Sequence, residues 1–213
     1  MLKLLLLIYI HVYILTVVPN RSQSSSDAMD SDSGIAFDQK LSAALKILGT
    51  RVIGEIAFQL DRRILETVFR RRASASNDEL IKNRVYGYTS QNIGALITKE
   101  TLRGDGTRNL QKESFYRKRH EKLLYILKDH GYNKMVHEEF VKKMVEKYGT
   151  LNATPSKKVI QMYGLEEPKL LEALLGEVTA DKAEFVHSLV LLNCLRVMSS
   201  WDGVDGGGSL LKW

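Results

Sequence analysis

The stretch Val52-Ile-Gly-Glu-Ile-Ala-Phe-Gln-Leu-Asp-Arg-Arg-Ile-Leu-Glu-Thr-Val-Phe69 contains the clearest amphipathic helix pattern in the chain. Apolar residues recur at every fourth position along it, at Val52, Ile56, Leu60 and Ile64, so they share one face of a helix. The polar residues fall mostly on the other faces: Glu55, Gln59, Asp61, Arg62, Arg63 and Glu66. A stripe this wide must be buried against other elements. We therefore expect the rest of the chain to be organised around this helix.

Helical periodicity extends on both sides of this stretch. An amphipathic segment from about residue 37 to 48 precedes it, and Gly49-Thr50 either breaks that helix or lets it bend into the organising one. Apolar spacing and capping signals predict further helices at about 89–102, 111–130, 136–148, 154–164, 168–175 and 181–198. The last is apolar nearly all round, which predicts the central buried helix.

One short segment favours a strand. Arg84-Val-Tyr-Gly-Tyr-Thr89 alternates with an aromatic bias, and the end of the chain, 209–213, is a possible partner for it. The predicted fold is mainly α: a single-domain helical bundle with at most a small two-stranded β element, about 84–89 with 209–213.

The N-terminus differs in character from the rest. Residues 1–18 are basic at the start and then apolar, as in a signal peptide. A targeting segment, a membrane anchor and an incorrectly predicted first exon all explain them. Residues 19–34 are rich in Ser and Asp and are expected to be a disordered linker, so the predicted helical domain is 35–213. The glycosylation triplets Asn20-Arg-Ser22 and Asn152-Ala-Thr154 would matter only in the secretory pathway.

Composition limits the possible classes of function. The chain has 213 residues, of which 44% are hydrophobic, and a net charge of +6. This surplus permits contact with acidic partners but is also that of an ordinary soluble surface. Cys194 is the only cysteine, which excludes an internal disulfide and a multi-cysteine zinc site, and favours the cytosol or nucleus over secretion.

Motifs for catalysis are missing from the sequence. His137-Glu-Glu begins like a zinc-protease motif, but position 141 is a valine, so the second ligand is absent. The five histidines are scattered, and neither a nucleophile elbow nor a phosphate-binding glycine loop occurs. We expect a protein that is not an enzyme, with no cofactor, no metal site and no small-molecule substrate.

Two basic segments are candidate functional sites. Arg71-Arg72-Ala73-Ser74 has the form of a substrate of a basophilic kinase, which makes Ser74 a possible phosphosite; a solvated basic loop is the alternative. A second segment, in the helix predicted at 111–130, offers a possible basic contact face made by Arg117, Lys118, Arg119 and Lys122, with Tyr116 and Tyr125 available to stack on bases. Because Glu113, Glu121 and Asp129 are interleaved with these cations, a salt-bridged solvent face is the favoured interpretation, and nucleic acid is not the expected partner.

Several short pieces of the sequence occur in a familiar order. They are Gly54-Glu-Ile-Ala-Phe-Gln-Leu-Asp-Arg-Arg-Ile-Leu65, Tyr86-Gly-Tyr-Thr with Asn92-Ile93, Gly131-Tyr-Asn with Val136-His137, Tyr148-Gly149, Leu191-Leu-Asn-Cys-Leu195, the Asp202-Gly203 turn and the terminal Trp213. Over about residues 50–213 the chain resembles the speriolin C-terminal domain family, the spermatogenesis- and centriole-associated proteins and their speriolin-like relatives.

The resemblance implies a non-enzymatic protein of the centrosome and the germ-cell cytoskeleton that acts in the cytoplasm through protein contacts, and it transfers no functional residues. The apolar N-terminus is foreign to the family, and 70–83 is longer than the corresponding connection. The alternatives are a secreted or membrane-anchored helical protein, with membrane contact only if residues 1–18 are a real anchor, and a basic nucleic-acid-binding domain.

Overall fold

The computed structural model describes residues 31–70, 78–157, 160, 165–179, 181–201 and 209–212. Side chains are described from residue 49 to 70 and, within the later ranges, from residue 81 onward. The helices are α2 (Ser31–Phe69), α3 (Asp78–Val85), the 3-10 turn η1 (Ser90–Asn92), α4 (Ile93–Thr101), α5 (Leu110–Lys128), α6 (Lys134–Tyr148), α8 (Pro168–Val178) and α9 (Lys182–Ser199). The predicted mainly α fold is confirmed.

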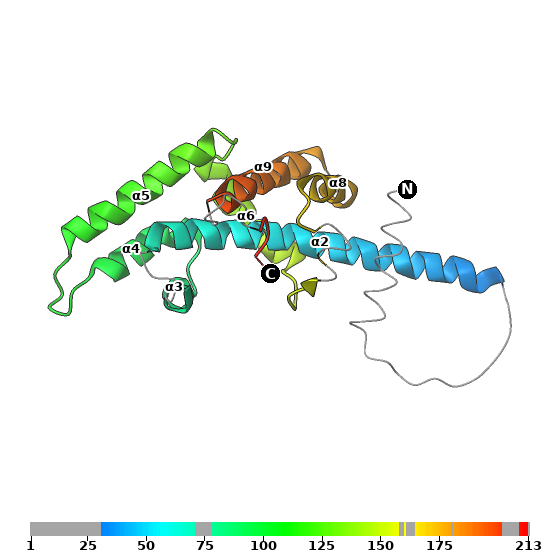
Figure 1. Ribbon diagram of the computed structural model, residues 1–213, viewed down its shortest axis with the longest axis horizontal. Coiled ribbons are helices and arrows are strands. Elements are labelled where there is room, and N and C mark those ends of the chain that lie inside the picture. The colour runs from blue at the N-terminus through cyan, green and yellow to red at the C-terminus, as the bar shows by residue number, and fades with distance from the viewer. Residues whose placement is uncertain are drawn as a thin grey trace.

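Helix α2 is the axis of the molecule. It runs for 39 residues without a break through Gly49-Thr50, and its C-terminal half packs against α3, α5, α6, α8 and α9, while its N-terminal half extends beyond the other helices (Figure 1). Side chains of Val178 and Leu174 come so close to Gly49 that a Cβ atom there would lie 2.4 Å from Val178 Cγ2. The organising role predicted for 52–69 is therefore observed, and α2 begins at Ser31, inside the segment predicted to be a linker.

The central position expected for the last helix belongs to α2 instead. From Val52 to Phe69 only Phe58, at 39%, counts among the exposed residues. Helix α9 buries Leu191, Leu195 and Met198 but leaves Val186 46% exposed. The prediction that α9 is the central buried helix was therefore wrong. It relied on apolar residues that lie on the outer face of α9, and single exposed apolar side chains are normal on a protein surface.

Local signals placed most helix ends correctly. The Asp181 side chain accepts a hydrogen bond from Glu184 N at 2.8 Å and begins α9. Gly131, with φ 90°, follows α5, where the left-handed conformation favours glycine. The helix predicted at 154–164 lies mostly outside the described residues.

The possible β element is not formed within the part of the chain that the structure describes. Arg84 and Val85 end α3, Tyr86 and Gly87 make a turn, and 209–212 have no strand partner. The aromatic alternation in 84–89 arises from a tight turn in which Gly87 has φ 79° and Tyr86 points to solvent. An isolated bridge between Leu102 and Arg108 lies in the turn before α5.

Candidate interaction surface

Four polar residues of the organising stretch are buried rather than solvated. Glu55, Gln59, Asp61 and Arg63 are between 3% and 9% exposed. Buried charged and amide groups destabilise a fold unless hydrogen bonds replace the lost water. Each of these side chains meets backbone groups of a segment far away in the sequence.

Gln59 and Arg63 hold the end of the chain against α2. The Gln59 amide donates from Nε2 to Lys212 O at 2.9 Å and accepts from Lys212 N at 2.6 Å. The Arg63 guanidinium donates from Nη2 to Ser209 O at 2.8 Å and to Leu210 O at 3.2 Å. Leu210 and Leu211 are buried beside these contacts. Leu210 and Leu211 are therefore part of the core, and side chains of α2 supply the hydrogen-bond partners that a neighbouring strand would otherwise provide.

Asp61 and Arg62 fix the turn between α3 and η1. Ser90 N donates to Asp61 Oδ1 at 2.7 Å. Arg62 donates to Val85 O at 3.2 Å and also to Tyr88 O, and it pairs with Asp61 at 2.6 Å. The segment expected to be a strand is thus held by two side chains in place of a neighbouring strand.

The third contact lies at the end of α6, where Gly54 lets the two helices touch. A Cβ atom on Gly54 would lie 1.7 Å from Gly149 O. Beside it, Leu151 N donates to Glu55 Oε2 at 3.1 Å and Arg51 donates to Thr150 O at 3.1 Å. The sequence Gly54–Leu65 is therefore a set of side chains that fasten the fold, and it leaves little polar surface for a partner.

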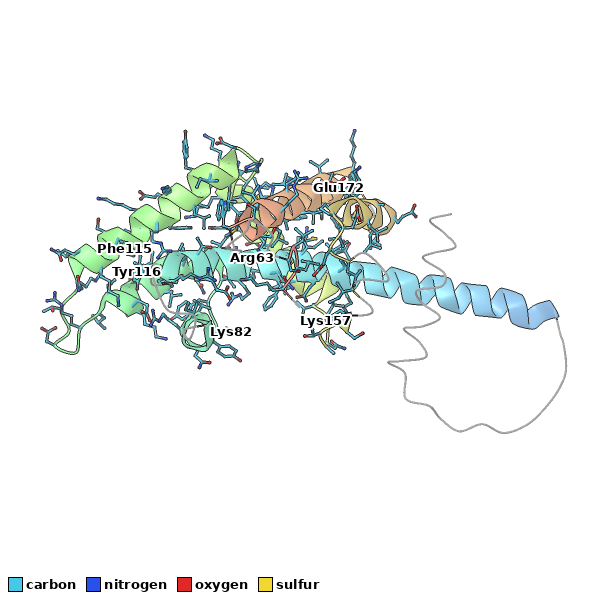
Figure 2. All side chains as sticks on the ribbon, in the orientation of Figure 1. Arg63, Lys82, Phe115, Tyr116, Lys157 and Glu172 are labelled. Atoms are coloured by element: carbon cyan, nitrogen blue, oxygen red, sulfur yellow. The ribbon has the colours of Figure 1, made fainter. Side chains whose placement is uncertain are left out.

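The predicted basic face on α5 divides into two pairs. Arg117 forms an ion pair with Glu113 at 2.7 Å, and Arg119 donates to Thr67 O and Arg70 O at the end of α2. Arg117 is thus paired along its own helix and Arg119 supports the fold, whereas Lys118 and Lys122 are exposed without such partners among the described residues. Of the two tyrosines expected to stack on bases, Tyr116 is buried against Phe69 with ring centroids 4.8 Å apart, and Tyr125 is 72% exposed. Figure 2 shows Phe115 and Tyr116 near the start of α5, beside the end of α2.

The predicted phosphosite cannot be placed in the same way. Ser74 and its two arginines, Arg71 and Arg72, lie outside the described residues. The idea remains a prediction.

A hollow of about 440 Å³ lies where α5 ends and α6 begins. Its surface is mainly apolar, although charged and polar residues outnumber apolar ones in the lining: Glu121, Leu124, Tyr125, Lys128, Tyr132, Asn133 and Lys134. We call it the α5–α6 hollow. The hollow does not show in the sequence because its two sides come from different helices, although a tyrosine among the charged residues of a helix, Tyr125, is a signal that points there.

Two histidines that are distant in the sequence meet near this end of the molecule. His137 Nε2 lies 3.1 Å from His187 Nδ1, and His137 Nδ1 accepts from Asn133 N at 2.7 Å. Burial and the neighbouring His187 lower the pKa of His137. The described residues contain no group of three or more His, Cys, Asp or Glu side chains placed to hold a metal ion.

Further buried groups titrate abnormally in the core. Burial lowers the pKa of His120 to about 4 and raises the pKa of Glu138 to about 7. Glu138 Oε1 is buried without a hydrogen bond, and burial also raises the pKa of Tyr132. Burial raises the pKa of Cys194 to about 12, which keeps it a thiol. His120, Tyr132 and Cys194 are buried and Glu138 is partly buried, so these groups bear mainly on stability.

The sequence profile of the Speriolin C-terminus family matches residues 52–213. This chain belongs to that family. It is 32% identical to mouse Speriolin over 155 residues, which is 72% of this chain and 30% of the mouse protein. It is 31% identical to human Speriolin over 166 residues, which is 72% of this chain and 24% of the human protein.

The matched region begins at the buried half of α2 and ends at the tail that Gln59 and Arg63 hold. The family's unit therefore coincides with the packed part of the structure. The chain spans about a third or less of the length of these relatives. No solved structure matches the chain, and no described helix is long and apolar enough to cross a membrane.

Proposed function

We propose that the chain is a non-enzymatic protein-interaction module that works in the cytoplasm at the centrosome or cytoskeleton of germ cells. The α5–α6 hollow is the observation that supports an interaction role most directly. It combines apolar walls with the highly exposed Tyr125, and tyrosines in such settings are frequent anchors of protein interfaces. The cellular setting is supported by membership of the Speriolin C-terminus family.

The titratable groups of the core fit a binding role better than catalysis. Glu138, His120 and Cys194 have shifted pKa values, yet burial is the first cause in each case. A catalytic group also has to reach a substrate, and these three side chains do not line the hollow.

A second candidate follows from residues 1–18, whose sequence is typical of a signal peptide or anchor. Asn152, in the triplet Asn152-Ala-Thr154, is exposed in the loop after α6. An oligosaccharyltransferase would therefore have access to this asparagine if the chain entered the secretory pathway.

Imaging of the C-terminally tagged chain in germ-line cells, with and without residues 1–18, separates the two candidates. Centrosomal or cytoskeletal signal from both forms is the expected result. Secretory-pathway signal with an endoglycosidase-sensitive mass shift, lost in Asn152→Gln and on removal of residues 1–18, would overturn the proposal. Asn83→Gln provides a matched asparagine control, because Asn83 is exposed but is followed by Arg84-Val85 and lies in no glycosylation triplet.

A further inference from the structure

We propose that the α5–α6 hollow binds a short acidic segment of a partner protein that inserts one large apolar side chain. This inference rests on the proposed function, since it names the class of partner for that module. Three properties of the hollow support it: a fixed shape, an apolar floor and an excess of positive charge.

The shape is fixed by the turn that joins the two helices. Gly131 N donates to Lys128 O at 3.0 Å and Tyr132 N donates to Leu127 O at 3.1 Å. Helix α9 supports the turn from below, because a Cβ atom on Gly131 would lie 3.2 Å from Val190 Cγ2. A ligand that enters a preformed site loses less free energy to ordering the protein.

The floor suits an apolar anchor. Leu124 and Tyr132 contribute apolar surface, and Tyr125 stands at the edge with 72% of its surface exposed. A volume of about 440 Å³ is at the low end of the range for small ligand sites. It is large enough for one tryptophan, phenylalanine or leucine side chain and part of its backbone.

The charge around the hollow favours carboxylates. Lys128 and Lys134 line it, and Lys118 lies three residues before Glu121 on the same face of α5. No carboxylate among the described residues lies within ion-pair distance of these three ammonium groups, whereas Arg117 is already paired with Glu113. Glu121 is the one acidic residue of the lining, and Lys134 additionally acts at longer range on the buried Glu138 carboxyl.

A nucleic acid fits this surface less well than a peptide. A phosphate backbone needs a continuous run of cations, and here Glu121 interrupts the lysines while two of the four predicted contact cations are engaged elsewhere. A peptide with acidic residues around one anchor needs only positive charge beside the hollow. Lys128 and Lys134 in the lining supply it, together with the exposed Lys118 further along α5.

Fluorescence anisotropy of the full chain tests the inference with a labelled peptide of aspartate and glutamate residues around one tryptophan. We expect binding that weakens as salt is added. Tyr125→Ala is expected to weaken it by about tenfold, as for a tyrosine that anchors an interface, and Lys128→Glu with Lys134→Glu by at least that factor. All three side chains are exposed or line the hollow, so circular dichroism should be unchanged. Lys169→Glu and Tyr86→Ala, both exposed and on other elements, are the matched controls.

The inference is overturned if replacing the tryptophan by alanine leaves the affinity unchanged, or if the lysine variants bind the acidic peptide as well as the unaltered chain. A single-stranded oligonucleotide of equal charge that binds more tightly would identify a nucleic-acid site instead. Failure of the peptide to bind, with a tagged chain that still reaches the centrosome, would reject the hollow and retain the module. If the peptide binds the hollow but the tagged chain enters the secretory pathway, the hollow is retained as a binding site and the proposed cellular role is rejected.

Discussion

The C-terminal half of α2 and the whole of α5 have similar amphipathic patterns but opposite environments. Both alternate apolar residues with a mixture of Glu, Lys or Arg and an amide. On α2 the polar side chains are buried and bind backbone groups of distant segments, whereas on α5 most of them face solvent. The polarity of a helix face therefore does not reveal its exposure. A polar helix face is buried where the fold brings backbone N–H and C=O groups that lack other partners against it.

The segments on the polar face of α2 explain why so many partners are needed. The tail at 209–212, the turn before η1 and the loop after α6 are not in regular secondary structure. Their backbone groups would be unsatisfied in a core made only of apolar side chains. Helix α2 supplies these partners at the three places where the segments cross it: Gln59 and Arg63 bind the tail, Asp61 binds the turn and Glu55 binds the loop.

The largest expected effect comes from Gly54→Val. Its side chain would occupy the space of Gly149 O, which lies 1.7 Å from the Cβ position. Helix α6 would have to move away from α2, which breaks the contacts of Glu55 and Arg51 with the following loop. We expect a loss of about 4 kcal/mol or more in unfolding free energy, as for severe overpacking combined with lost buried hydrogen bonds. Urea unfolding followed by circular dichroism measures it.

Gly94→Ala is the matched control for that substitution. Gly94 also lies in a helix, but a Cβ atom there meets nothing within 4 Å. Alanine should be neutral or add up to about 1 kcal/mol of stability, because it restricts the unfolded chain. Equal losses at both positions would show that the contact between α2 and α6 is not the cause.

The next effect compares one arginine from each helix, Arg63→Met and Arg117→Met. The first leaves Ser209 O and Leu210 O without their donor in a buried site, and we expect a loss of about 2–4 kcal/mol. The second removes an exposed pair with Glu113 and should cost less than about 0.5 kcal/mol.

Hydrogen exchange at the chain end sharpens this comparison. In Arg63→Met the amides of 210–212 should exchange faster than in the unaltered chain, since the tail loses one of its two anchors on α2. In Arg117→Met they should not change. Unaltered exchange in both variants would mean that Gln59 and the buried leucines hold the tail alone.

The sequence predicted the parts of the fold that depend on local pattern. Apolar periodicity located the buried stripe of α2, and caps such as Asp181 and the stop at Gly131 placed helix ends. The burial of Asp61 and Arg63 could not be predicted from the sequence, because their hydrogen-bond partners are 29 and up to 147 residues away. The same reason hid the His137–His187 pair and the α5–α6 hollow, each of which needs two helices to be placed first. For the candidate surface, the sequence indicated exposed lysines on α5. It did not indicate that the Arg119 side chain donates hydrogen bonds to carbonyl groups at the end of α2.

A third effect depends on pH and arises from Glu138, a partly buried residue of α6 whose carboxyl is affected by the charge of Asp61 on α2. Burial raises its pKa from 4.5 to about 7 in the folded protein. Between these values the folded state holds a proton that the unfolded state has released, so stability falls as the pH rises through this window. Glu138→Gln cannot ionise and should gain about 1–3 kcal/mol at pH 8, with no gain near pH 4.

His120 has the opposite slope and provides the internal control. Burial lowers its pKa from 6.5 to about 4, so only the unfolded state takes up a proton between these values, and stability falls as the pH drops. The two slopes oppose each other between about pH 4.5 and 6.5. In Glu138→Gln the histidine slope should remain, so that thermal denaturation shows steeper acid destabilisation than in the unaltered chain. Parallel pH profiles for the two proteins would contradict the assignment to Glu138.

The smallest effect separates two adjacent cations of α5, Arg119 and Lys118. Arg119 donates to Thr67 O in the last turn of α2 and to Arg70 O just after the helix. The last carbonyls of a helix have no partner within it. Arg119→Ala should therefore cost about 1 kcal/mol, and Lys118→Ala less than about 0.5 kcal/mol. The binding of the acidic peptide should show the reverse order, because Lys118 is exposed three residues before Glu121 of the hollow while Arg119 is held at the end of α2. If Arg119→Ala weakened peptide binding more than Lys118→Ala without lowering stability, the division of this basic segment into fold-supporting and partner-facing residues would be wrong.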